Sequence, residues 1–301
     1  MSESNIVADF WLDRPDAEEV LDSKAADSQT KDAIRSLNRD GITVIRGAHA
    51  PALCKAVVAD YQRYVDTHRE YVMQNLDALG REKRLVNFHR WSSAAAQIGT
   101  NRKVMEILDL MFDTETAVYT SLTFKYGTQQ PVHRDTPHFA TWPPKRFAGV
   151  WTALETISPD AGPLFYHPGA HRFTIDPQRF MNEAKQRLPG APTGEQLLMA
   201  LDLYNGEVIR TAPTVSDAKT LELQIGDTVI WHPELPHGGS PAADPHHTRW
   251  SIVFHCAPEN VQVHQHNAFF SHKGPKAPPP IYGYIDSNGR KLALSGEVAF
   301  M

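Results

Sequence analysis

The chain has 301 residues, a formal net charge of −5 and 41% hydrophobic residues. The acidic balance without a basic cluster argues against a nucleic-acid partner, and no apolar run approaches the ~18 residues of a membrane span. The first residues lack the charged-then-apolar pattern of a secretory signal. With only Cys54 and Cys256 present, no disulfide framework is implied. We therefore expect a cytoplasmic protein without a membrane partner.

The first third of the chain favours helices. Residues 1–30 are polar and acidic, and we expect a mobile arm or a peripheral helix there. After this arm, residues 31–301 are expected to form a single domain. Apolar residues recur with a helical period further on, and Gly41 is placed to end the first helix. The predicted elements are a helix over 31–39, a strand over 42–46, and amphipathic helices over 51–69 and 101–112.

From residue 116 the hydrophobic period changes to two, and short strands alternate with Pro and Gly. This pattern is typical of a barrel or jelly roll and not of alternating β/α units. We expect a mainly β protein with flanking helices, its core at about 116–258. A helical insertion at about 172–216 interrupts the strands and is either a functional cap or a peripheral decoration. A Pro-rich extension at 273–301 should add little core.

The most informative motif is His133-Arg134-Asp135, followed by His237 in LPHGGS and Arg249 in TRWS. On a strand, residues i and i+2 share a face, so His133 and Asp135 can bind one metal while Arg134 points away. Two imidazoles and one carboxylate on one octahedral face leave three positions open, as non-haem Fe(II) oxygenases require.

The segments around the motif support a metal site. GDTVIWHPELPHGGS is typical of a strand running into a site, and TRWSIVFHCA predicts a second strand. Arg249 and Ser251 would share one face of that strand. A buried arginine needs an anion, which a dicarboxylate cosubstrate would provide in bidentate fashion.

These residues resemble the phytanoyl-CoA dioxygenase family of Fe(II)/2-oxoglutarate-dependent oxygenases. FAGVWTALE resembles the central strand of the family, and AGPLFYHPGAHR resembles its Pro-Gly-Ser-His-Arg turn, with Ala170 where Ser is usual. The ordered landmarks cover roughly residues 31 to 258. The resemblance implies a double-stranded β-helix (jelly roll, cupin-like) with Fe(II), 2-oxoglutarate and O₂ as cofactor and cosubstrates.

For individual residues, the resemblance implies that iron is bound by His133, Asp135 and His237. Arg249 would bind 2-oxoglutarate with help from Ser251. Gln130 could contact the keto acid or be a turn residue, and Trp151 could flank the cosubstrate or fill the barrel.

The other histidines have weaker signals. His138 could face the cavity or lie in a surface loop, whereas His167 and His171 are expected to form structural hydrogen bonds. Three histidines show no ligand spacing with an acidic partner and are interpreted as bystanders: His255, His264 and His266.

The favoured function is oxidation, most simply hydroxylation, of a C–H bond in a small metabolite, with secondary metabolism as a candidate setting and with release of succinate and CO₂. Desaturation, ring formation or epimerisation at the same iron, and a non-catalytic cupin-like metal-binding protein, stay open as alternatives. Halogenation is disfavoured because Asp135 occupies the position that chloride would need. We expect the substrate pocket to be lined by the 136–146 loop and the 172–216 insertion, which favours a largely apolar substrate. The oligomeric state is not predicted.

Overall fold

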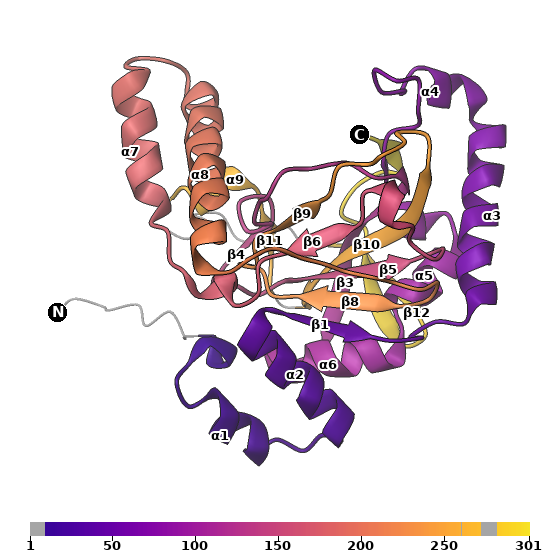
Figure 1. Ribbon diagram of the computed structural model, residues 1–301, viewed down its shortest axis with the longest axis horizontal. Helices are drawn as coiled ribbons and strands as arrows, with labels where there is room; N and C mark the ends of the chain where they lie inside the picture. The colour runs from indigo at the N-terminus through magenta and orange to yellow at the C-terminus, as the bar shows by residue number, and fades with distance from the viewer. Residues whose placement is uncertain (1–9, 260, 272–281) are drawn as a thin grey trace.

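A mixed β-sheet forms the centre of the molecule in the computed structural model, which describes residues 10–259, 261–271 and 282–301 (Figure 1). Within these residues the sheet has nine strands. Seven follow the order β1-β8-β5-β10-β3-β13-β12, while β2 pairs with both β3 and β14. All of the pairings are antiparallel except that of β13 with β3. The bounds are β1 Ile42–Ile45, β2 Leu85–Val86, β3 Thr116–Tyr126, β5 Ala148–Ala153, β8 Thr228–Trp231, β10 Thr248–Pro258, β12 Tyr284–Ser287, β13 Arg290–Ala293 and β14 Ala299–Phe300.

Side chains of β10 alternate between the two faces of this sheet. Arg249, Val253 and His255 line a cavity on one face. The opposite face carries the apolar set Trp250, Ile252, Phe254 and Cys256, which joins the main hydrophobic core. One strand thus contributes to both the core and the site.

Helices cover the apolar face of the sheet, as the helical first third of the sequence predicts (Figure 1). The α2 helix ends at Gly41, whose φ of 79° is the left-handed conformation that glycine adopts readily. The α6 helix begins after Asn101, whose side chain accepts a hydrogen bond from the Val104 amide. The covering helices are α2 Ser28–Asp40, α3 Pro51–Thr67, α4 Arg69–Met73, α5 Ser93–Gly99 and α6 Arg102–Phe112.

Two smaller sheets complete the β structure. The first has β6 (Leu164–Tyr166) between β7 (Lys219–Thr220) and β9 (His237–Gly239), and the second pairs β4 (Ala140–Thr141) with β11 (Val263–His264). Side chains of β6 and β9 line the same cavity as those of β5 and β10. The cavity therefore lies between the main sheet and a second, smaller layer of strands. The structure thus has a large mixed β-sheet with flanking helices, in agreement with the expected combination of a β core and outer helices.

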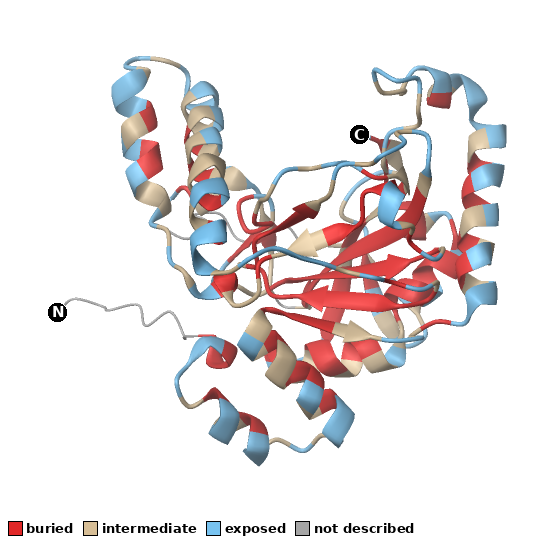
Figure 2. Ribbon diagram, in the orientation of Figure 1, coloured by how far each residue is buried: buried red, intermediate tan, exposed pale blue. Residues whose placement is uncertain are grey.

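The predicted insertion is a helical hairpin beside the sheets. Helices α7 (Pro177–Arg187) and α8 (Thr193–Val215) pack against each other through a small apolar cluster of their own. Figure 2 shows that much of their outer surface is exposed, whereas the central strands are buried. No residue of 172–216 lines the described cavity, so the prediction that this insertion forms the pocket wall is wrong. A short helix, α9 (His266–Phe269), follows β11.

Both ends of the described chain pack more firmly than the sequence indicates. The Trp11 indole donates a 2.8 Å hydrogen bond to the Met111 carbonyl, and Leu12 is buried. Residues 10–30, which include α1 (Ala17–Ser23), therefore pack on the helical layer, so that of the two alternatives the peripheral helix and not the mobile arm describes them. At the other end, Leu292 and Phe300 join the core, although this segment was expected to add little. The Pro-rich stretch over 272–281 lies outside the described residues.

None of the helices in the described ranges has the length and apolar character needed to cross a membrane.

Candidate metal centre and adjoining cavity

His133 and His237 face each other across an isolated antiparallel bridge. Each backbone amide donates a 3.0 Å hydrogen bond to the carbonyl of the other residue. Their Nδ1 atoms lie 2.8 Å from the Pro131 carbonyl and 3.0 Å from the Leu235 carbonyl. Because a carbonyl oxygen can only accept, each Nδ1 carries the proton, and Nε2 keeps the lone pair that a metal ion needs.

Asp135 completes the cluster. Its Oδ1 atom lies 3.5 Å from the Nε2 atom of His133 and 3.8 Å from that of His237. The three possible ligand atoms all fall within 4.8 Å of one another. Two imidazole nitrogens and one carboxylate oxygen converging in this way form the donor set of a 2-His-1-carboxylate metal site.

The charge states suit metal binding. Burial raises the pKa of Asp135, but the neighbouring imidazoles of His237, His133 and His255 outweigh burial and hold it well below the usual range. Burial lowers the pKa of His237 to about 4. An ionised carboxylate and a neutral imidazole are the forms that bind a metal ion.

The second oxygen of Asp135 is bound by a tryptophan. The Trp231 indole Nε1–H donates a 2.9 Å hydrogen bond to Oδ2. The indole lies against β5, where a Cβ atom on Gly149 would approach it to 2.1 Å. Glycine at position 149 therefore makes room for the ring that orients the carboxylate.

The loop that carries the motif is held from behind by Arg134, which points away from the metal site as predicted. Its guanidinium donates to the Glu234 carboxylate at 2.8 Å and to the Phe173 carbonyl at 2.7 Å. The Thr136 hydroxyl donates to the Pro233 carbonyl at 2.9 Å. These bonds connect the metal loop to the loop before His237 and to the turn after Ala170.

His167 and His171 make structural hydrogen bonds, as predicted. The His167 Nδ1 atom lies 2.7 Å from the Ser216 carbonyl, and the His171 Nε2 atom lies 3.1 Å from the Asn38 carbonyl.

Arg249 lies in the same cavity and is 4% exposed. Its Nη1 atom donates to the Gly162 carbonyl at 2.6 Å, while its Nε atom has no partner among the described residues. A Cβ atom on Gly239 would lie 3.3 Å from the guanidinium. Burial lowers the pKa of Arg249 to about 10, so the group remains charged at neutral pH. A buried cation with an unpaired donor and glycine beside it suits a carboxylate ligand.

The other predicted residues are distributed around Arg249. Gln130 and Trp151 both line the cavity. Ser251 is buried outside the lining, and its hydroxyl donates to the Arg249 carbonyl at 3.2 Å. Its observed contact is therefore with the strand that carries Arg249.

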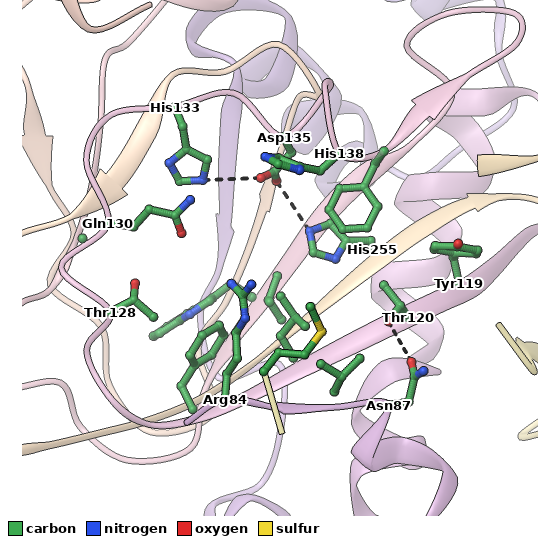
Figure 3. Close-up of a pocket in the computed structure, with 18 of the residues that line it drawn as sticks. Arg84, Asn87, Tyr119, Thr120, Thr128, Gln130, His133, Asp135, His138 and His255 are labelled. Atoms are coloured by element: carbon green, nitrogen blue, oxygen red, sulfur yellow. Dashed lines mark hydrogen bonds and ion pairs between the residues drawn. The ribbon is translucent and has the colours of Figure 1, made fainter. Parts of the chain in front are cut away.

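Sequence reasoning missed two neighbours of Asp135. His255, interpreted as a bystander, lines the cavity with its Nε2 atom 3.6 Å from Oδ2 of Asp135, and its ring stacks on Phe139 (Figure 3). The alternation that places Arg249 and Ser251 on one face of the strand also includes residue 255, so a signal existed. For Trp231, the two-residue period of its strand predicts a position on the same face as Val229. It gives no indication that the indole contacts Asp135.

The cavity beside the metal cluster has a volume of about 460 Å³. Beyond the groups named above, its wall includes Arg84, Asn87 and Tyr119, together with residues of the segment 295–301 (Figure 3). His138 also faces the cavity, as one of its two interpretations had it. The expected lining by the 136–146 loop is met through His138 and Phe139.

A His-Asp-His cluster between two β layers, with a buried arginine in the same cavity, defines the class of iron-dependent oxygenases that use 2-oxoglutarate. The family model described as phytanoyl-CoA dioxygenase (PhyH) matches residues 37–249, which is more than half of the chain. The protein therefore belongs to the phytanoyl-CoA dioxygenase family.

Individual relatives agree with the family. The peroxisomal phytanoyl-CoA dioxygenase of Mus musculus is 30% identical over 114 residues, 38% of this chain and 29% of the mouse protein. The matched stretch thus spans less than a third of that relative. Among solved structures, the epimerase SnoN in complex with Fe3+ and alpha ketoglutarate superposes with a TM-score of 0.61 and 15% identity, covering 89% of this chain and 99% of SnoN. EctD from S. alaskensis with bound Fe superposes with a TM-score of 0.58 and 15% identity, covering 83% of this chain and 82% of EctD. At these identities the structural likeness concerns the fold.

Proposed function

We propose that the protein is an Fe(II)/2-oxoglutarate-dependent dioxygenase, built on a single double-stranded β-helix domain, that hydroxylates a C–H bond of a small metabolite. The observation that carries this proposal is the pairing of two groups in one cavity. The side chains of the metal cluster are in the protonation states that bind a metal ion. In the same cavity, Arg249 is a buried cation whose Nε donor has no partner among the described residues.

In this proposal the chain's residues have separate tasks. The Nε2 atoms of His133 and His237 and the Oδ1 atom of Asp135 would hold iron on one face. Iron, when bound with 2-oxoglutarate and O₂, would supply C–H oxidation coupled to decarboxylation of the keto acid to succinate and CO₂. Arg249 would bind the distal carboxylate and thereby orient the keto acid towards the metal. Gln130 and Trp151 would flank it.

The fold alone does not select hydroxylation. The similar structures include the epimerase SnoN, the carbocyclase SnoK and EctD with 5-hydroxyectoine. Asp135 occupies the third ligand position, which disfavours halogenation. A binding protein without turnover would have no use for the buried, partly unpaired Arg249. Free, buried Cys54 and Cys256 suit a reducing cytoplasmic location.

The test is succinate formation from 2-oxoglutarate with Fe(II) and O₂, measured for the wild type and for Arg249→Lys. Lysine keeps the charge but loses the planar fork, so we expect the KM for 2-oxoglutarate to rise by roughly 10- to 100-fold. Arg102→Lys, at an exposed position that does not line the cavity, should leave this KM unchanged. Absence of 2-oxoglutarate-dependent succinate in the wild type would refute the proposed function. An Arg249→Lys variant with an unchanged KM for 2-oxoglutarate would remove Arg249 from the cosubstrate site.

A further inference from the structure

Arg84 is fixed at the cavity wall by a pair of very short strands. It directly precedes β2, which pairs with β14 through Leu85 opposite Phe300 and Val86 opposite Ala299. The Met301 amide donates a 3.0 Å hydrogen bond to the Arg84 carbonyl and extends this pairing by one residue. The strand that follows position 84 is therefore held on both sides, by β14 and by β3, where Leu85 pairs with Thr123 and Val86 with Leu122.

Strand alternation turns Arg84 towards the cavity. Leu85 is fully buried in the core, whereas its neighbours Arg84 and Val86 both line the cavity. Figure 3 shows the Arg84 side chain reaching from this wall into the cavity, across the cavity from Asp135 and His138. The direction of the Arg84 side chain therefore follows from the pairing register of β2.

The guanidinium of Arg84 has no partner in the described chain: no carboxylate lies within ion-pair distance, and no acceptor takes its side-chain N–H groups. Burial lowers the pKa of Arg84, and Asp135 is the acidic group that offsets part of this effect. By contrast, the two Nη atoms of Arg134 donate to Glu234 and to two backbone carbonyls. A half-buried arginine without partners is the exception in this site.

The charges around the cavity leave a place for an anion. Asp135 is committed to the metal cluster, and Arg249 is assigned to the cosubstrate by the proposed function. Glu297, the other carboxylate of the described wall, is exposed and makes no ion pair with Arg84. Arg84 therefore faces the interior as an uncompensated cation. Apolar side chains line the same cavity, among them Val86, Leu122, Phe139 and Ala299.

We propose that Arg84 binds the anionic end of the prime substrate, so that the substrate is an organic acid with a carboxylate or a phosphate group and an apolar body. The planar guanidinium would bind either group through paired N–H donors. The apolar wall would contact the body of the substrate beside the metal cluster. This inference rests on the proposed function for the assignment of Arg249, and it changes the expected substrate from a largely apolar metabolite to an acid.

The test uses octanoate, octyl phosphate and octan-1-ol as probes, which share one apolar chain and differ in the head group. Binding is measured by tryptophan fluorescence, since Trp151 and Trp231 line the cavity. Ni(II) replaces Fe(II), and saturating 2-oxoglutarate occupies its own site, so no turnover occurs. We expect Arg84→Met to weaken octanoate, octyl phosphate or both by about 10- to 100-fold and to leave octan-1-ol unchanged. The head group that loses more affinity distinguishes a carboxylic acid from a phosphate ester.

Two further variants complete the design. Arg84→Lys keeps the charge and should retain part of the affinity, which also controls for folding. Arg102→Met removes an arginine whose side chain is 92% exposed and should change nothing. The proposal is overturned if neither anion binds the wild type, or if Arg84→Met affects the alcohol and the anions equally. It is also overturned if Arg84→Met weakens 2-oxoglutarate instead of the probes. Failure of the proposed function would show separately, as missing succinate.

Discussion

The two ends of the cavity are built in different ways. At the metal end, the functional groups come from long or closely bridged strands and are held by many internal bonds: His133 and His237 share a backbone bridge, and Asp135 is oriented by Trp231. At the opposite end, Arg84 and the 295–301 segment form a wall from two-residue strands, and the arginine side chain has no partner among the described residues. The comparison indicates that the protein fixes the positions of its side chains at the metal end. At the far end, the N–H donors of Arg84 stay available for a ligand.

The largest effect is expected from a substitution that displaces the Trp231 ring, which orients Asp135 at the metal end. In Gly149→Ala the new Cβ atom would lie 2.1 Å from the Trp231 indole, and neither the buried ring nor β5 can move freely. We expect a loss of about 1–3 kcal/mol in the free energy of unfolding and weakened metal binding, measured by denaturant unfolding with and without Ni(II). Gly194→Ala, in open space on α8, is the matched control and should not destabilise. Wild-type stability and metal affinity in Gly149→Ala would contradict the assigned role of the indole.

Trp231→Phe is a milder change at the same place. It keeps an aromatic ring but removes the N–H that donates to the Oδ2 atom of Asp135. Groups that orient metal ligands typically contribute roughly 10- to 100-fold to affinity, so we expect the Kd for Ni(II) to rise by that factor in titration calorimetry. Trp91→Phe, at a partly exposed ring away from the cavity, serves as the control. If both variants bind Ni(II) like the wild type, the hydrogen bond has no role in metal binding.

The smallest effect is expected in the helical hairpin. Leu198 on α8 is 57% exposed, and no residue of the hairpin lines the cavity. Leu198→Gln should change the free energy of unfolding by no more than about 0.5 kcal/mol and leave the KM for 2-oxoglutarate unchanged. A strong loss of turnover in this variant would show that the hairpin acts on the site after all and would extend the functional region beyond the two ends of the cavity.

The metal end could be predicted because part of its information is local and because the resemblance to a family supplied the distant ligand His237. His133 and Asp135 are two residues apart, and the alternation of one strand places Arg249 and its neighbours on a face. The same rule reaches His255, which was set aside only because it has no acidic neighbour in the sequence. Its acidic neighbour, Asp135, comes from another segment of the fold.

The far end could not be predicted from the sequence. Strands β2 and β14 have two residues each and give no periodic signal, and the Asn87 side chain donates to the Glu297 carbonyl across 210 positions. Such pairing depends on the completed sheet and on no local preference. The buried Phe10–Leu12 segment was obscured in a similar way by the acidic residues that follow it.

The most direct test of the central claim is the stoichiometry of Fe(II) binding under anaerobic conditions, measured by equilibrium dialysis on the wild type, His237→Ala and His246→Ala. His246 is an exposed loop histidine and controls for the loss of an imidazole as such. We predict one Fe(II) per chain for the wild type and for His246→Ala, and close to none for His237→Ala. Full Fe(II) binding by His237→Ala would contradict the assignment of the metal centre to His133, Asp135 and His237.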